Sequence, residues 1–112
     1  MSVFVEAASL LIDIEAELRR MGLWEREAPS AAALASTEPF CVDTLSLPQW
    51  LQFVFLPRMQ ALLEVERLPA GRCEVRPLAE QYFTDGGLPA TALIATIGQL
   101  DELLNSQLLD NS

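Results

Sequence analysis

The chain has 112 residues, 51% of them hydrophobic, which is enough for a single domain over residues 1–112 with one hydrophobic core. Sixteen acidic and seven basic residues give a formal charge of −9, which disfavours direct nucleic-acid binding because phosphates are held by clustered positive charge. The chain has no histidine, which excludes Ser-His and Cys-His catalysis and removes the commonest metal ligand.

The spacing of apolar residues predicts a first helix over residues 2–21. Seven apolar residues recur at steps of three and four and therefore share one face: Val3, Ala7, Leu10, Leu11, Ile14, Leu18 and Met21. Ser2 fits the N-cap position, and Gly22 stands where a left-handed residue often ends a helix. The acidic opposite face is interpreted as a solvated surface.

The next segment, residues 23–45, is a long connection without a sustained hydrophobic period. A loop of this length is uncommon in a compact domain, and it either serves a function or is packed down by its own side chains. We expect Trp24, Phe40 and Val42 to supply that packing. Ser30 is placed to cap a short helical turn within the loop.

A second long helix is predicted from Ser46 to Glu64, the stretch around which the rest of the chain is organised. Ser46 and Gln49 have the spacing of a capping box at its start. Pro57 lies in its interior, where it cannot donate a hydrogen bond to the Phe53 carbonyl and its ring crowds that carbonyl. The sequence therefore predicts a kink near these two residues.

Arg58 projects near the middle of the apolar face of this helix when successive residues are placed about 100° apart. A buried guanidinium must be paired and hydrogen-bonded, and Asp43 is the most economical partner. Two interpretations follow. Either Arg58 is a structural clamp that pairs with Asp43 and holds the loop, or it is the charged group of an anion-accepting pocket.

The other side of the same helix carries Phe53 and Leu56 among polar residues. Either the long loop covers these two side chains, or they form an exposed apolar patch for a partner. The candidate surface for a partner or ligand comprises seven residues: Trp24, Phe40, Asp43, Trp50, Phe53, Leu56 and Arg58.

Two further helices complete an all-α fold. A short third helix is expected from Pro77 to about Phe83, and a fourth follows Pro89. The fourth helix has an apolar stripe formed by Ala90, Leu93, Ile97, Leu100, Leu104 and Leu108. The predicted architecture is a compact antiparallel bundle of about four helices, with a long loop between the first two and a proline-kinked central helix.

Four short segments carry a family resemblance: Ser36-Thr37-Glu38-Pro39-Phe40, Asp43-Thr44, Trp50-Leu51-Gln52 and Leu56-Pro57-Arg58-Met59. In combination they resemble the YqcC family, small all-helical bacterial proteins without an assigned activity. The resemblance extends over nearly the whole chain and implies a compact all-α bundle. Members of this family are often labelled tRNA pseudouridine synthase C.

The residues do not support that label as an activity of this chain. Pseudouridine synthases use a catalytic aspartate in a Gly-Arg-Leu-Asp type motif on a much larger mixed α/β fold. The nearest string here is Gly71-Arg72-Cys73-Glu74, which lacks the aspartate and lies in an apparent turn. An accessory role beside such an enzyme stays open, and it rests on association alone.

The two cysteines and the N-terminal segment indicate where the protein resides. Cys41 and Cys73 are far apart and form no CxxC motif, so no zinc site is expected and both are interpreted as reduced. Glu6 and Asp13 interrupt the first apolar run, so no signal peptide is predicted. No apolar stretch approaches the roughly 20 residues that span a bilayer, so a cytoplasmic location without membrane contact is expected.

Composition and motifs favour a non-enzymatic role without a cofactor, because no phosphate loop, metal-ligand cluster or facing pair of carboxylates is present. The leading hypothesis is a protein-interaction or accessory module with an unknown protein partner. The alternative is a small-ligand-binding helical domain with Asp43 and Arg58 in the pocket. A third is binding of a basic partner by the −9 surface, which predicts steep salt dependence. Homo-oligomerisation stays open.

Overall fold

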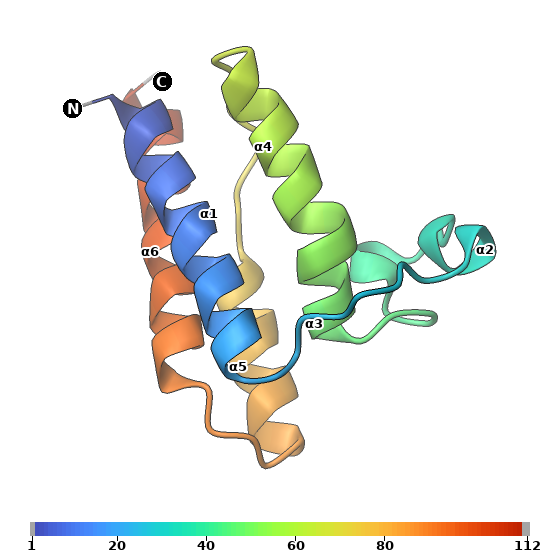
Figure 1. Ribbon diagram of the computed structural model, residues 1–112. Coiled ribbons are helices and arrows are strands. Elements are labelled where there is room, and N and C mark those ends of the chain that lie inside the picture. Colours follow the sequence, from blue (N-terminus) through green and yellow to red (C-terminus); the bar gives the residue numbers. More distant parts are fainter. Residues whose placement is uncertain (1, 111–112) are drawn as a thin grey trace.

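The helices run alternately in opposite directions, as Figure 1 shows for the computed structural model, which describes residues 2–110 and their side chains up to Gln107. The elements are α1 (Val3–Arg20), α2 (Ala31–Leu34), a short 3₁₀ turn (Pro39–Cys41), α3 (Leu47–Trp50), a π-turn (Leu51–Phe55), α4 (Leu56–Glu64), α5 (Val75–Asp85) and α6 (Thr91–Asp110). No strand occurs among residues 2–110. The predicted all-α antiparallel bundle is confirmed.

The predicted helix ends are present as capping contacts. The Ser2 hydroxyl accepts a hydrogen bond from the Phe4 N–H at 3.1 Å, and Gly22 follows α1 with φ +72°. At the start of α3, the Gln49 N–H donates to the Ser46 hydroxyl at 3.3 Å and the Ser46 N–H donates to the Gln49 side-chain oxygen at 2.9 Å. These contacts satisfy donors that every helix start leaves free.

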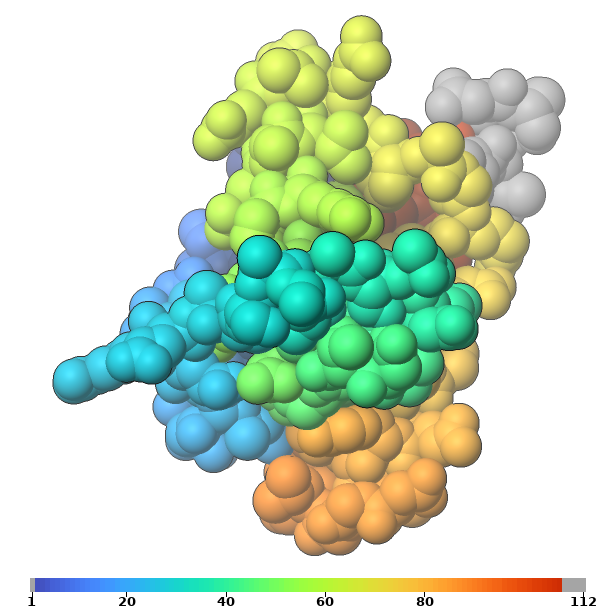
Figure 2. All heavy atoms as spheres, turned by 90° about the vertical axis from the view of Figure 1, so that its right-hand side faces the viewer, coloured from blue at the N-terminus to red at the C-terminus, as the bar shows by residue number. Residues whose placement is uncertain are grey.

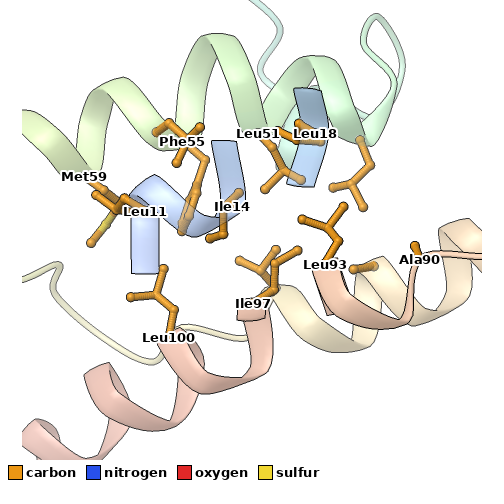
Figure 3. Packing of buried hydrophobic residues seen from close by; sticks show 14 of the residues in the cluster. Leu11, Ile14, Leu18, Leu51, Phe55, Met59, Ala90, Leu93, Ile97 and Leu100 are labelled. Atoms are coloured by element: carbon orange, nitrogen blue, oxygen red, sulfur yellow. The ribbon is translucent and has the colours of Figure 1, made fainter. Parts of the chain in front are cut away.

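The core lies between α1, the continuous column of α3, π-turn and α4, and α6, with α5 packed along α6 (Figure 3). Its largest fully buried side chains are Ile14, Leu18, Leu51, Leu56, Phe83, Leu93, Ile97 and Leu100. The predicted stripes of the first and fourth helices supply most of them. Leu108 of the fourth stripe falls outside the described side chains.

The distortion predicted around Pro57 takes the form of the π-turn. Pro57 has no N–H, so the carbonyl of Phe53 lacks the donor that an α-helix would provide. Immediately before it, the Leu56 N–H bonds to the carbonyl of Leu51, five residues back instead of four. This wider turn makes room for the proline ring, and the helix continues through it without a break.

The long loop is held down by one buried amide and by a small second cluster of apolar residues. Gln52 of the π-turn is 7% exposed, accepts a hydrogen bond from the Glu25 N–H at 2.9 Å and donates to the Glu25 carbonyl at 2.7 Å. The second cluster comprises Cys41, Leu45 and Val54, with Ala33, Leu34 and Trp50 against it. The prediction that Val42 packs here is wrong, because its side chain is 66% exposed and Cys41 occupies the inner position.

The segment between α4 and α5 is tied to α6 by two polar side chains. Asn105 accepts a hydrogen bond from the Cys73 N–H at 2.8 Å and donates to the Cys73 carbonyl at 2.9 Å. Asp101, only 7% exposed, accepts from the Arg76 N–H at 2.8 Å and so caps the first turn of α5. This cap explains why α5 begins at Val75, two residues before the predicted Pro77.

Gly98 of α6 lies directly under the Arg76 side chain of α5. A Cβ at Gly98 would stand 2.7 Å from the Arg76 Cδ, which is too close for any side chain without movement. The absence of a side chain at Gly98 thus leaves room for the Arg76 side chain of α5 to lie against α6. Among residues 2–110, no helix is both long and apolar enough to cross a membrane.

Candidate functional site

Arg58 lies on the surface, so the predicted clamp between Arg58 and Asp43 is wrong. Its side chain is exposed, and it forms no ion pair with a carboxylate within the described part of the chain. Asp43 instead accepts a hydrogen bond from the Ser36 hydroxyl at 2.5 Å. The π-turn is the reason: one additional residue in a turn rotates every later side chain by about 100°, so Met59 takes the core position that Arg58 was expected to occupy.

The same rotation changes the predicted apolar patch. Leu56 is 2% exposed and belongs to the core, so it cannot contribute to a surface for a partner. Phe53 is half-buried and belongs to neither core cluster. Trp24 is half-buried against the core, with the Arg19 guanidinium 4.5 Å from its ring centroid. These residues are therefore not brought together into one surface.

Three of the predicted residues, Phe40, Trp50 and Arg58, do meet in one cleft, which we call the aromatic–arginine cleft. It has a volume of about 250 Å³ and is lined by Phe40, Trp50, Phe55, Arg58, Met59, Leu62, Pro69, Arg72, Cys73, Glu74 and Val75. Asp43 is not among the lining residues. Figure 2 looks onto the face where the segments that form it meet: the end of the long loop in teal, α4 in yellow-green and the segment before α5 in yellow.

The aromatic rings of the cleft pack against one another in a row. The Phe40 ring meets the Trp50 ring edge-on at 4.9 Å between centroids, and Trp50 lies 5.2 Å from Phe55 at an angle of 32°. Such offset and edge-on arrangements are the favourable ones for aromatic pairs. Phe40 and Cys41 both have left-handed backbone conformations, with φ +57° and +51°. That strained turn directs Cys41 into the second cluster and leaves Phe40 at the cleft, 36% exposed.

The charged side chains of the cleft carry a net positive charge. Arg72 pairs with Glu74 at 3.0 Å, which balances those two charges. Arg58 adds one further positive charge without a carboxylate partner among the described residues. The cleft thus has a charge of +1, on a chain whose total is −9.

Cys73 lines the cleft but is unsuited to act as a nucleophile. Burial, together with its hydrogen bond to the Asp101 carboxylate at 3.1 Å, raises the pKa of the Cys73 thiol to about 12. The thiolate, which is the reactive form, is therefore scarce at neutral pH. No group of three histidine, cysteine, aspartate or glutamate side chains able to hold a metal occurs in residues 2–110. Cys73 therefore contributes to the cleft as a lining side chain rather than as a nucleophile.

A second surface, which we call the α1 face, was not predicted from the sequence. Val5 and Ile12 are 57% and 69% exposed, although both are large apolar side chains on a helix that packs in the core. With Ala8 they recur at steps of three and four, so a second apolar stripe on the first helix was the signal that would have found them. The α1 face consists of these three residues and the two hollows beside them.

Both hollows of the α1 face are rimmed by acidic residues. One lies between α1 and α4, has a volume of about 600 Å³ and includes Glu64 and Glu66 in its lining. The other lies between α1 and α6, has a volume of about 700 Å³ and includes three carboxylates, Glu6, Asp13 and Glu102. Val5 lines both. The α1 face is thus an apolar ridge between two negatively charged depressions, and neither depression contains a basic residue.

Comparison with known proteins identifies relatives that match nearly the whole chain. The DUF446 family, described as tRNA pseudouridine synthase C, matches residues 6–103. An uncharacterized protein of Haemophilus influenzae is 34% identical over 96 residues, which are 86% of this chain and 90% of that protein. The solution NMR structure of protein YqcC from E. coli superposes with a TM-score of 0.79 at 33% identity, covering 93% of this chain and 89% of that one.

A further relative shares only a segment. Over 56 residues the chain is 52% identical to tRNA pseudouridine synthase C of Pectobacterium carotovorum subsp. carotovorum. That segment is 50% of this chain but 15% of that protein. The name therefore belongs to a chain most of which lies outside the similarity.

Proposed function

The chain belongs to the DUF446 family, and we propose that it acts as a non-enzymatic protein-interaction module whose α1 face binds a basic, apolar-faced segment of a partner protein. The observation that carries the proposal is the exposure of Val5 and Ile12, at 57% and 69%, on a ridge between two acidic hollows. Clustered apolar side chains on a surface, rimmed by polar groups, are typical of protein interfaces.

Charge complementarity defines the chemistry of the partner. Five carboxylates line the two hollows: Glu6, Asp13, Glu64, Glu66 and Glu102. An amphipathic helix with an apolar stripe and flanking lysine or arginine residues would cover the ridge and place positive charge over each hollow. Electrostatic attraction of this kind accelerates association and selects against acidic partners.

An accessory role beside a tRNA pseudouridine synthase is part of the proposal. It is supported by the family description and by the similarity of a 56-residue segment to part of a protein with that name. The residues favour an accessory role over catalysis, because the string Gly71-Arg72-Cys73-Glu74 has no aspartate to act on a base. A cytoplasmic location also belongs to the proposal, and the two free cysteines support it.

The proposal is tested with two synthetic helices of about five turns that share a leucine face but carry either lysine or glutamate on its flanks. We expect the lysine peptide to bind and the glutamate peptide not to bind, with affinity falling as salt rises because the carboxylates of the α1 face are screened. Isothermal titration at two salt concentrations measures both effects. Equal binding of the two peptides would contradict the proposal.

The matched pair Ile12→Asp and Val42→Asp localises the surface. Both side chains are β-branched apolar groups of nearly equal exposure, 69% for Ile12 and 66% for Val42. Only Ile12 lies on the α1 face. We expect Ile12→Asp to weaken lysine-peptide binding at least about tenfold and Val42→Asp to leave it unchanged.

Titration of a purified tRNA pseudouridine synthase C then separates the two parts of the proposal: if the peptide binds and the enzyme does not, the docking surface stands and the accessory role beside that enzyme is wrong.

A further inference from the structure

We propose that the aromatic–arginine cleft is a binding site for a small organic anion that carries one flat ring, such as an aryl phosphate or an aromatic carboxylate. The cleft and the α1 face use different sides of α4. Arg58, Met59 and Leu62 line the cleft, whereas Gln60, Leu63 and Glu64 line the α1–α4 hollow. This inference does not depend on the proposed docking function.

Charge distinguishes this cleft from the two hollows of the α1 face. The α1–α6 hollow has three carboxylates and the α1–α4 hollow has two, and neither contains an arginine. The aromatic–arginine cleft alone among them contains guanidinium groups, those of Arg58 and Arg72. Because the chain as a whole repels anions, an anion that binds must be held by local pairing, and Arg58 is the group with no carboxylate partner in the described residues.

Arginine is suited to this task because its planar guanidinium forms two parallel hydrogen bonds to a carboxylate or phosphate. The group is exposed at the cleft, so it can turn toward an incoming anion without first breaking an ion pair. Arg72 also lines the cleft, where its guanidinium pairs with the Glu74 carboxylate at 3.0 Å. The free cation is therefore Arg58, and Arg72 and Glu74 form a polar rim.

The walls of the cleft select for a ring beside the anion. Trp50 is half-buried between the rings of Phe40 and Phe55, whose centroids lie 4.9 and 5.2 Å from its own, so a flat apolar group entering the cleft meets aromatic surface. Met59 and Leu62 close the apolar side. A volume of about 250 Å³ is below the roughly 300–1,000 Å³ of pockets for drug-sized ligands, which limits the occupant to about one ring with its charged group.

The backbone around Phe40 holds the entrance in place. Consecutive left-handed residues at Phe40 and Cys41 are unusual for residues with side chains, and they persist where the surroundings over-determine them. Here Cys41 is anchored in the second cluster, 7% exposed, and its carbonyl accepts hydrogen bonds from the N–H groups of Thr44 and Leu45. The Phe40 ring is thereby presented to the cleft by a turn that is anchored through the burial and hydrogen bonds of Cys41.

The test uses the full chain labelled with ¹⁵N and follows the indole N–H signal of Trp50, assigned by its loss in Trp50→Phe. The probes are phenyl phosphate and benzoate, with inorganic phosphate and benzamide as controls that lack the ring or the charge. We expect both ring-bearing anions to shift the Trp50 signal in a saturable way and both controls to bind at least about tenfold more weakly. The stronger of the two anions identifies whether phosphate or carboxylate is the preferred group.

Substitution of the free arginine decides the assignment. We expect Arg58→Gln to weaken binding of the better probe by about tenfold or more, since a hydrogen-bonded charge pair is lost. Arg26→Gln is the matched control, because Arg26 is also exposed and without a carboxylate partner among the described residues but does not line the cleft. No saturable shift with either anion, or equal weakening by Arg58→Gln and Arg26→Gln, would overturn the proposal.

Discussion

Cys73 shows how neighbouring groups determine the chemistry of a single side chain. Its thiol donates to the Asp101 carboxylate at 3.1 Å, while Asn105 holds its backbone from the same helix, α6. Desolvation is the largest cause of its raised pKa, and the Asp101 carboxylate is the next, first through its hydrogen bond to the thiol and then through its negative charge. Both disfavour the thiolate. Cys73 therefore helps to hold the segment before α5 against α6 and is not a reactive thiol at neutral pH.

The first prediction concerns the pH dependence that follows from this thiol. The pKa of Cys73 rises from 9.0 to about 12 on folding, so the folded state keeps a proton that the unfolded state loses. The stabilisation from this group is therefore complete below pH 9 and disappears as pH increases toward 12. Between pH 8 and pH 10.5 we expect the free energy of unfolding to fall more for the parent chain than for Cys73→Ala, measured by urea denaturation.

Asp101→Asn provides the control for the cause of the shift. The substitution removes the negative charge while an amide oxygen remains to accept from the Arg76 N–H. We expect the Cys73 thiol to react faster with iodoacetamide at pH 8.5 in this variant than in the parent chain. An unchanged rate, with the fold intact by circular dichroism, would mean that the carboxylate does not contribute to the raised pKa.

The structure brings three of the seven candidate site residues into one cleft, for reasons that differ from those expected. Phe40, Trp50 and Arg58 line one cleft. Arg58 was selected because it was expected to be buried, yet its interest lies in being exposed and free of an ion pair. Asp43 was expected to pair with Arg58 because it lies just before the same helix. Its carboxylate instead accepts a hydrogen bond from the Ser36 hydroxyl. Side-chain pairing across a loop depends on the path of the loop, which no local pattern encodes.

At the scale of the element, a regular α-helical period predicts the core positions before the π-turn but not those after it. Before it, Leu47 and Leu51 face the core as an α-helical period requires. After it, the core positions are Met59 and the half-buried Leu63, each one residue later than that period predicts. The signal for the distortion, Pro57, was read from the sequence. The form of the distortion depends on which hydrogen bonds the surrounding packing allows, and the sequence alone does not specify it.

A paired deletion and insertion test this register. Deletion of Phe53 together with Pro57→Ala leaves seven residue steps between Leu51 and Met59, which is close to two α-turns, so both side chains continue to face the core. Phe53 is half-buried and outside both core clusters, so little packing is lost. We expect a folded protein with a cooperative thermal transition and an α-helical region in place of the π-turn, seen in the amide chemical shifts.

Insertion of one alanine after Phe53 is the opposing variant. It rotates α4 by a further 100° or so, which turns Met59 outward and brings polar residues toward the core. We expect a loss of several kcal/mol in the free energy of unfolding, in the range of large core disruptions. If the deletion unfolds the chain while the insertion is tolerated, the assignment of the π-turn as an accommodated extra residue is wrong.

At the scale of the whole molecule, the architecture followed from local rules that agree with one another. Caps at Ser2, Ser30 and Ser46 and apolar steps of three and four predicted the helices and their order, and the structure confirms the antiparallel bundle. The α1 face was not predicted, because an amphipathic helix was assigned one apolar stripe and its remaining side chains were assumed to be polar. Val5 and Ile12 show that a core helix can carry a second apolar stripe that is exposed to solvent.

The bundle is expected to behave as one domain because α6 connects its parts. α6 packs against α1 and α5, and its Asp101 and Asn105 side chains hold the segment before α5. Leu100, 0% exposed, lies in the middle of this helix (Figure 3), far along the chain from Trp50 and the second cluster. In a single cooperative unit, damage at Leu100 lowers the stability of every region equally.

Leu100→Ala is therefore expected to lower the free energy of unfolding by about 2–5 kcal/mol, the usual range for a buried leucine. The unfolding transitions followed by far-UV circular dichroism and by Trp50 fluorescence should shift by the same amount. The fluorescence measurement uses a Trp24→Phe background so that Trp50 is the reporter. Leu88→Ala is the matched control, because Leu88 is 46% exposed at the turn between α5 and α6, and its loss should change stability little. If the Trp50 transition stayed in place while the helical signal shifted, the long loop and α3 would form a separate cooperative unit, and the proposed single domain over residues 1–112 would be wrong.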